Sequence, residues 1–307
     1  MLDRSIFCFP SWTKKAVSFT IDDGNLRLDK RFIDTVRPGG ITGSFNLCGL
    51  GRMGNLTPEE YREFYRGFEV TNHCSDHPKV ILPTDDYVIA DEPFDPNTSD
   101  RTKIYKTETE GLYRKFYTTW WGHVATTETY IKLIDQGKRE LESVFGEGSV
   151  VAFVWPYCRQ NDPALWAHLE KAGYASVRRT GYADFDLPAD RMDWCYNANH
   201  TNLNENAAKF DALTDDGKLK WFCFGVHSHD FENNNCWDVL EAFVANYGNR
   251  PNDFWYATVR DIFEYEDAVN AAEITDTAIV NNSDKTLYAK IGDARISIPA
   301  HSQYNIN

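Results

Sequence analysis

The sequence lacks the features that direct a protein to membranes or nucleic acid. No apolar run approaches the length of about 18 residues expected of a membrane-spanning helix, and residues 1–4 begin neither a basic segment nor the apolar stretch of a signal peptide. Acidic residues outnumber basic ones by 46 to 32, giving a net charge of −14. This charge excludes the basic surface that nucleic acid or an anionic membrane requires. We therefore expect a cytoplasmic protein, although a chain that has lost a leader would look the same.

Paired cysteines are also lacking. The chain has 7 Cys, an odd number, and no Cys-x-x-Cys, so a disulfide framework is not expected. Aromatic residues, in contrast, make up 14 % of the 307 residues, with 9 Trp and 16 Tyr. This composition suits a protein with a large buried core that also binds rings or sugars.

Short apolar runs predict strands, and most of them are followed by a helical pattern. Near-continuous apolarity, as in residues 150–154, is typical of strands covered on both faces in a parallel sheet. Alternating strands and helices predict an α/β fold, a β/α barrel whose site lies at the carboxyl ends of the strands. The predicted strands are residues 16–21, 43–47, 68–71, 150–154, 174–178, 221–226 and 254–258.

Two segments depart from this pattern. Residues 78–122 are rich in Tyr and Trp but show no clear period, and an insertion of this kind is expected to be a functional loop. Beyond residue 272 polarity alternates around a Gly-Asp pair, which predicts a hairpin. We expect a barrel domain over residues 1–272, interrupted by the insertion, and a small β appendage over 273–307. The appendage either seals the barrel or binds sugar.

Two short motifs carry the predicted chemistry. An apolar run ends in Asp22, Asp23 and Gly24, and His73 and His77 follow about fifty residues later. Alone, Asp-Asp-Gly is most often a turn and two histidines at this spacing are most often a coincidence. Together, one carboxylate and two imidazoles form a three-ligand set that leaves positions on a metal for water and substrate. The second carboxylate remains as a base, which predicts a metal-assisted hydrolase.

In these motifs the sequence resembles the polysaccharide deacetylase (NodB-homology) family of metal-dependent amide and ester hydrolases, over roughly residues 14–265. The resemblance implies a distorted (β/α)7 barrel of the NodB-homology type, with Asp22 as general base and Asp23 as metal ligand. His73 and His77 match the family's two-histidine metal motif, with Cys74 in place of a hydroxyl residue. We interpret Cys74 as a buried filler. The implied cofactor is a divalent metal, with Zn²⁺ as the first choice and Co²⁺, Mn²⁺ or Fe²⁺ as alternatives.

The later motifs are looser. Tyr157 looks like the third-motif tyrosine, which supplies a backbone N–H to the oxyanion. His227 resembles the general acid of the last motif. His229 competes for that role, because only one of two alternate positions on an extended segment faces the site. The predicted substrate-binding residues are Trp120, Trp121, Trp155, Pro156, Arg159, Asp193, Trp194 and His229.

The third motif departs from the family pattern. The family has an arginine two residues before the motif proline, where this chain has Val154. Without a nearby cation, the carboxylate of Asp22 loses an interaction that keeps it ionised. Arg159 or Arg178 can replace the missing cation, and we expect Arg159 because it is nearer in sequence.

The predicted function is removal of an acyl group, most simply acetyl, from an amino or hydroxyl group of a small or oligomeric saccharide. One alternative is a hydrolase of a cyclic amide or ureide on the same fold, which the altered third motif favours. A second alternative is a non-catalytic glycan-binding protein. The presence of both acidic residues and both histidines argues against it. Neither nucleic acid nor a membrane is expected as a partner.

Overall fold

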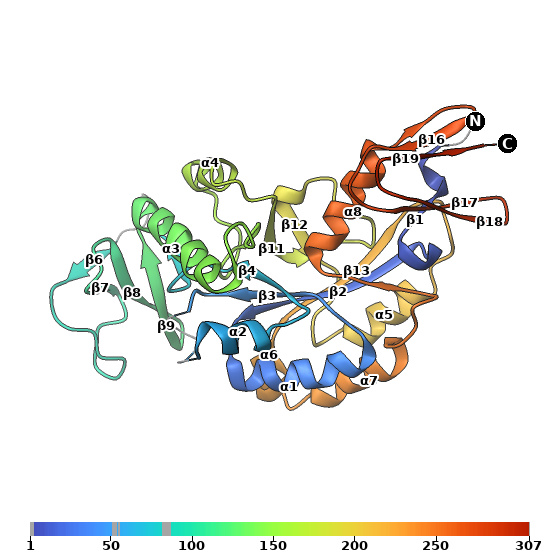
Figure 1. The fold of residues 1–307 in the computed structure, drawn as a ribbon. Helices are drawn as coiled ribbons and strands as arrows, with labels where there is room; N and C mark the ends of the chain where they lie inside the picture. The colour runs from blue at the N-terminus through green and yellow to red at the C-terminus, as the bar shows by residue number, and fades with distance from the viewer. Residues whose placement is uncertain (1–2, 51–53, 55, 82–86, 307) are drawn as a thin grey trace.

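A parallel sheet forms the centre of the molecule in the computed structural model, which describes residues 3–50, 54, 56–81 and 87–306. Its strand order is β12-β11-β10-β4-β3-β2-β13, and β14 pairs with β2 off this path. Figure 1 shows helices on both sides of this sheet. The strands are β2 (Lys15–Asp23), β3 (Ser44–Leu47), β4 (Glu69–Asn72), β10 (Ala152–Val154), β11 (Ser176–Tyr182), β12 (Trp194–Tyr196), β13 (Lys220–His227) and β14 (Trp255–Tyr256).

Two backbone hydrogen bonds bring the edge strands β12 and β13 together. The Asn197 N–H donates to the Cys223 carbonyl at 2.8 Å, and the Gly225 N–H donates to the Ala198 carbonyl at 2.9 Å. The sheet thus closes through an irregular segment that follows β12. The predicted α/β fold with a parallel central sheet is confirmed.

Two strands of the central sheet, β12 and β14, differ from the prediction. β12 was not among the predicted strands, because three residues after a polar turn leave no apolar run to detect. Residues 254–258 were predicted as a full barrel strand, but β14 pairs only with Ala16 and Val17. It lies beside the start of β2, where β3 has not yet begun pairing.

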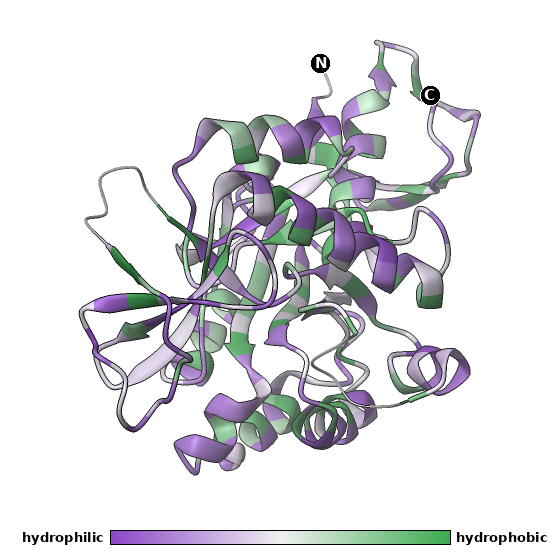
Figure 2. Cartoon of the chain, turned by 90° about the vertical axis from the view of Figure 1, so that its left-hand side faces the viewer, coloured by the Kyte–Doolittle hydropathy of each residue, from purple (hydrophilic) through white to green (hydrophobic). Residues whose placement is uncertain are grey.

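Amphipathic helices cover the barrel, and in Figure 2 they carry both hydrophobic (green) and hydrophilic (purple) stretches. In α1 the residues Leu28, Phe32, Ile33 and Val36 are buried at helical spacing. The Phe32 ring meets the ring of Phe19 with centroids 4.9 Å apart. The helices are α1 (Leu26–Val36), α2 (Pro58–Phe64), α3 (Thr127–Phe145), α4 (Pro163–Lys171), α5 (Leu203–Asp211), α6 (Ser228–Asn233), α7 (Trp237–Tyr247) and α8 (Val259–Ala271), with 3-10 turns at Arg4–Ile6, Pro10–Trp12, Arg37–Gly39 and Arg191–Asp193.

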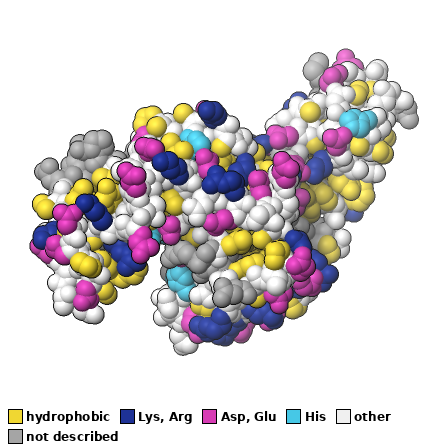
Figure 3. Space-filling model, turned by 60° about the vertical axis from the view of Figure 1, so that its left-hand side comes forward, with side chains coloured by type: hydrophobic (Ala, Val, Ile, Leu, Met, Phe, Trp, Pro, Cys, Tyr) yellow, Lys and Arg dark blue, Asp and Glu magenta, His cyan; other side chains and the backbone are white. Residues whose placement is uncertain are grey.

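The aromatic insertion is a five-stranded sheet and not the loop that its irregular pattern predicted. Its strand order is β5-β9-β8-β7-β6, and it projects from the barrel as a separate lobe (Figures 1 and 3). Tyr105 and Phe116 are buried between its strands and form a small core of their own. Its strands are β5 (Pro78–Val80), β6 (Val88–Ala90), β7 (Lys103–Lys106), β8 (Leu112–Tyr117) and β9 (Trp120–Ala125).

The C-terminal segment forms two small antiparallel sheets. β17 and β18 make the predicted hairpin, and the N-terminal strand β1 joins it along β17. The Tyr265 hydroxyl on α8 donates to the Cys8 carbonyl, which ties this part to the barrel. The domain boundary at residue 272 stays a prediction. The strands are β1 (Phe7–Cys8), β15 (Glu273–Ile274), β16 (Ala278–Asn281), β17 (Leu287–Ile291), β18 (Ala294–Ile298) and β19 (Ser302–Asn305).

None of the described helices combines the length and the apolar character needed to cross a bilayer.

Candidate active site

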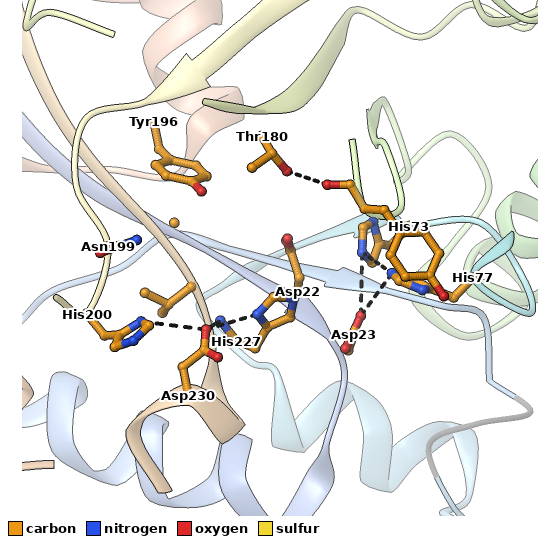
Figure 4. A pocket seen from close by; sticks show the side chains of 13 residues that line it. Asp22, Asp23, His73, His77, Thr180, Tyr196, Asn199, His200, His227 and Asp230 are labelled. Carbon is orange, nitrogen blue, oxygen red and sulfur yellow. Dashed lines mark hydrogen bonds and ion pairs between the residues drawn. The ribbon is translucent and has the colours of Figure 1, made fainter. Parts of the chain in front are cut away.

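Polar side chains from several strands meet in one pocket at the carboxyl ends of the strands. Asp22 and Asp23 end β2, His73 follows β4 directly, and His227 ends β13. The pocket has a volume of about 460 Å³ (Figure 4). It is lined by Asp22, Asp23, His73, His77, Tyr157, Thr180, Tyr196, Asn199, His200, Gly225, Val226, His227 and Asp230.

The two adjacent carboxylates point in different directions. Asp22 is still paired in the sheet, opposite Asn46 of β3 and His227 of β13. Asp23 and Gly24 both have φ of +78°, the left-handed region that strains a residue with a side chain. This turn sends the Asp23 carboxylate toward the histidines while that of Asp22 points elsewhere (Figure 4). The two residues are therefore placed for different tasks.

Asp23, His73 and His77 form a compact group of donor atoms. The two Nε2 atoms lie 3.2 Å apart, and Asp23 Oδ1 lies 3.5 Å from His73 Nε2 and 3.3 Å from His77 Nε2. Ligands of a tetrahedral metal with bonds of about 2.1 Å are separated by about 3.4 Å. The donor types and their spacing therefore fit a divalent metal of the zinc type.

The surroundings of His73 fix the nitrogen that faces this group. Its Nδ1 lies 2.9 Å from the Val154 carbonyl oxygen, which can only accept, so Nδ1 carries the proton. The Nε2 lone pair is then directed at the donor group, as in metal sites where a carbonyl orients the histidine. His77 follows through an irregular turn with positive φ at Cys74, Asp76 and His77 itself. Pro78 disfavours helical backbone at the residue before it, so the two histidines do not lie on a regular helix.

The environment keeps Asp23 ionised. Burial by itself raises the pKa of this carboxyl, but its contacts with His73 and the positive charge of His227 outweigh burial and hold the pKa well below its usual range. An ionised carboxylate is the form that ligates a metal.

Arg178 supplies the cation that the third motif lacks. Its Nη2 donates to Asp22 Oδ1, and the Asn46 amide donates to the same oxygen at 2.6 Å. The side chain of Arg178 is only 1 % exposed. Burial, the largest single influence, raises the pKa of Asp22, but the Arg178 charge together with the nearby His73 and His227 outweighs burial, and the pKa is lowered. Asp22 is therefore ionised at neutral pH.

The prediction that Arg159 provides this cation is wrong. Strands β10 and β11 pair in parallel with Val154 opposite Arg178, so the arginine comes from the neighbouring strand at the same level of the barrel. Arg159 lies beyond the strand end, half exposed, with its Nε 3.5 Å from Asp193 Oδ1. Separation along the chain was a poor guide because strand register determines which side chains meet.

His227 is held by Asp230, which sequence reasoning did not assign. The His227 Nδ1 and its backbone N–H each lie 2.9 Å from Asp230 Oδ2. Burial by itself lowers the pKa of His227, but the hydrogen bond to Asp230 and the charge of Asp22 raise it to about 9. His227 is thus protonated at neutral pH, as a general acid must be. The spacing His-x-x-Asp at the start of α6 is a capping-box pattern that offered a signal.

His229 differs from His227 in its environment. Burial and then the charge of His227 lower its pKa, so His229 is neutral where His227 is charged. The two rings stack with centroids 4.6 Å apart, because α6 begins at Ser228 and ends the extended segment. The expected opposite orientation of these side chains is wrong, whereas the preference for His227 as the acid agrees with these pKa directions.

Tyr157 connects the pocket to the insertion. Its φ is +61°, and its carbonyl accepts a hydrogen bond from Thr180 Oγ1 at 2.7 Å. Its ring lies 4.3 Å from that of His77 and stacks on Trp120 at 5.4 Å and 23°. The role of the Tyr157 N–H toward an oxyanion stays a prediction.

Some predicted substrate-binding side chains lie elsewhere. Trp155 and Trp194 are 1 % and 4 % exposed and belong to the two main cores, and Pro156 is buried as well. Their predicted contact with substrate is wrong, because these side chains pack under the rim. Trp121 packs on Phe94 within the insertion.

Asp193 is occupied by arginines near the rim. Its Oδ1 lies 3.0 Å from the Nε of Arg179 and 3.5 Å from that of Arg159. Neither Asp193 nor Arg159 is among the residues that line the pocket. Pocket residues that sequence reasoning missed include Thr180, Tyr196 and Asn199, two of which lie on β11 and β12.

Fold and site together define a β/α-barrel protein with a group of potential metal ligands at the carboxyl ends of its strands. A sequence profile of the polysaccharide deacetylase family matches residues 11–177, which is more than half of the chain. The chain belongs to the polysaccharide deacetylase family. No curated protein matches it in sequence.

Solved structures share the fold at low sequence identity. A provisionally assigned polysaccharide deacetylase from Mycobacterium smegmatis is 14 % identical, covers 89 % of this chain and 96 % of its own, and has a TM-score of 0.52. The Xyl-CE4 domain of a multidomain xylanase from the hindgut metagenome of Trinervitermes trinervoides is 12 % identical, with coverages of 83 % and 92 % and a TM-score of 0.47. A family 4 acetyl xylan esterase from Clostridium thermocellum, in complex with cobalt, is 14 % identical, with coverages of 81 % and 90 % and a TM-score of 0.44.

Proposed function

We propose that the protein is a metal-dependent hydrolase that removes an acyl group, most simply acetyl, from an amino or hydroxyl group of a saccharide. One observation carries the proposal: a donor group of the zinc type, an ionised carboxylate and a protonated imidazole share one pocket. Membership of the polysaccharide deacetylase family supports the substrate class.

Asp23, His73 and His77 would hold the metal, with Zn²⁺ as the first choice because two imidazoles and a carboxylate suit it. When bound, the metal polarises the acyl carbonyl and lowers the pKa of water. The protein's own contribution is to keep Asp23 ionised and, through the contact of the His73 Nδ1 with the Val154 carbonyl, to direct the His73 Nε2 toward the metal.

Asp22 is the proposed general base. Arg178 and Asn46 bind its Oδ1, which orients the carboxylate and keeps it ionised. The other oxygen then accepts the proton of the attacking water. His227 is the proposed general acid and donates its proton to the leaving amine or alkoxide. The lowered pKa of Asp22 suits a base and the raised pKa of His227 suits an acid.

The walls of the pocket suit a sugar ring. Tyr157, Thr180 and Tyr196 line the pocket. Trp120 is exposed outside this lining and stacks on the ring of Tyr157. Aromatic faces bind the apolar faces of sugars, and nearby hydroxyl and amide groups bind their hydroxyls. The proposed partner is therefore a small or oligomeric saccharide. The expected cytoplasmic location stays a prediction.

A panel of substrates tests the proposal. Protein reconstituted with zinc, cobalt or manganese is assayed for acetate release from N-acetylated and O-acetylated sugars, and for opening of cyclic amides and ureides. Acetate release that is lost in Asp22→Asn supports the proposal. Turnover of the cyclic compounds alone would select the alternative hydrolase. Sugar binding by metal-loaded protein without any turnover would indicate a glycan-binding protein.

A further inference from the structure

Cys48 lies next to the proposed metal ligands. It is the residue directly after β3, and it is 2 % exposed. Its Sγ lies 3.9 Å from Asp23 Oδ1. The donor atoms of Cys48, Asp23, His73 and His77 all lie within 4.8 Å of one another. No sequence motif includes this thiol, because the strand that precedes it contributes no other candidate ligand.

The position of Cys48 contrasts with that of Cys74, which lies between the two histidines in sequence. Cys74 is completely buried in the main hydrophobic core, and its backbone N–H is bound by the Asn72 side chain. Its thiol is absent from the donor group formed by the described residues. Cys74, the cysteine nearest the histidines in sequence, is thus a packing residue. Cys48, which follows β3, is the cysteine whose thiol lies beside the donor atoms.

The distances suit a fourth ligand. For a tetrahedral metal with a sulfur bond of about 2.3 Å and an oxygen bond of about 2.0 Å, the two ligand atoms lie roughly 3.5 Å apart. The observed 3.9 Å between Cys48 Sγ and Asp23 Oδ1 exceeds this by a few tenths of an ångström. A small side-chain movement closes that difference.

We propose that Cys48 is a fourth protein ligand of the metal in the enzyme without substrate. The inference rests on the proposed metal binding by Asp23, His73 and His77. On binding, the Cys48 thiol loses its proton to solvent, and a metal–sulfur bond replaces a metal–water bond.

This ligand has consequences for metal choice and access. A thiolate favours zinc over the oxygen-preferring manganese and magnesium. Four protein ligands fill a tetrahedral site, so substrate enters either by expansion to five ligands or by release of Cys48. Cys48→Ser is expected to weaken zinc binding by roughly ten- to a hundredfold, the range found when a supporting group of a metal site is removed, and to narrow the preference for zinc over manganese.

Absorption spectra of cobalt-loaded protein test the proposal. Wild type is expected to show a near-ultraviolet sulfur-to-cobalt charge-transfer band together with the visible bands of bound cobalt. Cys48→Ser should keep the visible bands and lose the charge-transfer band. Cys74→Ser is the matched control, with a buried thiol beside the ligands, and should keep both.

The outcomes separate the role of Cys48 as a ligand from the proposed metal-dependent deacetylation. Cobalt bound by wild type without a charge-transfer band, or with a band that persists in Cys48→Ser, overturns the role of Cys48 and leaves deacetylation standing. Loss of the band in Cys48→Ser alone supports it, whatever the acetate assay gives. Failure of wild type to bind cobalt overturns both claims, because the ligand group itself would then be wrong.

Discussion

Replacing Arg178 with methionine removes the cation that binds the proposed general base, Asp22, and keeps the other residues of the site. The Arg178 charge is the strongest of the influences that lower the pKa of Asp22 against the effect of burial, so its loss raises that pKa. An opposite charge at this range lowers a carboxyl pKa by about one to three units. The folded-state pKa of Asp22 is lowered, so the ionised base persists until the pH falls through that value. In Arg178→Met the acid limb of kcat/KM should therefore move up by about one to three pH units.

The assay is the pH dependence of acetate release. Below the shifted limb, kcat/KM should fall by about tenfold for each unit, or about 1.4 kcal/mol of transition-state stabilisation. Because one partner of a buried pair is removed, the free energy of unfolding should also fall by about 3–5 kcal/mol, so metal content and melting temperature are measured alongside. Arg159→Met is the control and should leave the limb in place. An unchanged limb in Arg178→Met, or a shift of equal size in Arg159→Met, would show that Arg178 is not the cation that keeps Asp22 ionised.

Three further predictions follow from the same geometry. Asp230→Asn removes the main group that raises the pKa of His227 to about 9, so the basic limb of the pH profile should move down by about one to two units; an unmoved limb would remove His227 as the acid. Asp23→Asn should lose the metal, measured by elemental analysis, and a full complement of metal in this variant would contradict its role as a ligand. Trp120→Ala should raise KM for a saccharide several-fold with little change in melting temperature, whereas Trp121→Ala should leave KM near the wild-type value. Equal effects on KM in both tryptophan variants would show that the Trp120 ring has no specific role in binding the saccharide.

The site motifs could be predicted because they are local. Asp22 and Asp23 follow an apolar run, and His73 and His77 are only four residues apart, so the sequence itself places each pair. The parallel sheet could be predicted because strands buried on both faces are apolar throughout. These features depend on short stretches of chain and on general rules of sheet architecture.

The partners of these groups could not be predicted because they depend on tertiary register. Arg178 meets Asp22 only because β11 pairs with β10 at Val154, and Cys48 joins the donor group only because β3 lies between β2 and β4. No periodicity in the sequence specifies such neighbours. The sheet in the insertion was missed for a related reason. Its strands are short and contribute only a few residues to a small core, so they lack a continuous apolar run.

The central claim is that metal-dependent chemistry in this pocket removes acetyl groups from saccharides. The most direct test measures acetate release from an acetylated saccharide by one preparation of wild-type protein, before chelation, after chelation and after addition of zinc. Acetate release should disappear when the metal is removed and return when zinc is added. Acetate release that is unchanged after complete removal of the metal would contradict the account, as would the absence of release with every divalent metal and acetylated sugar tried.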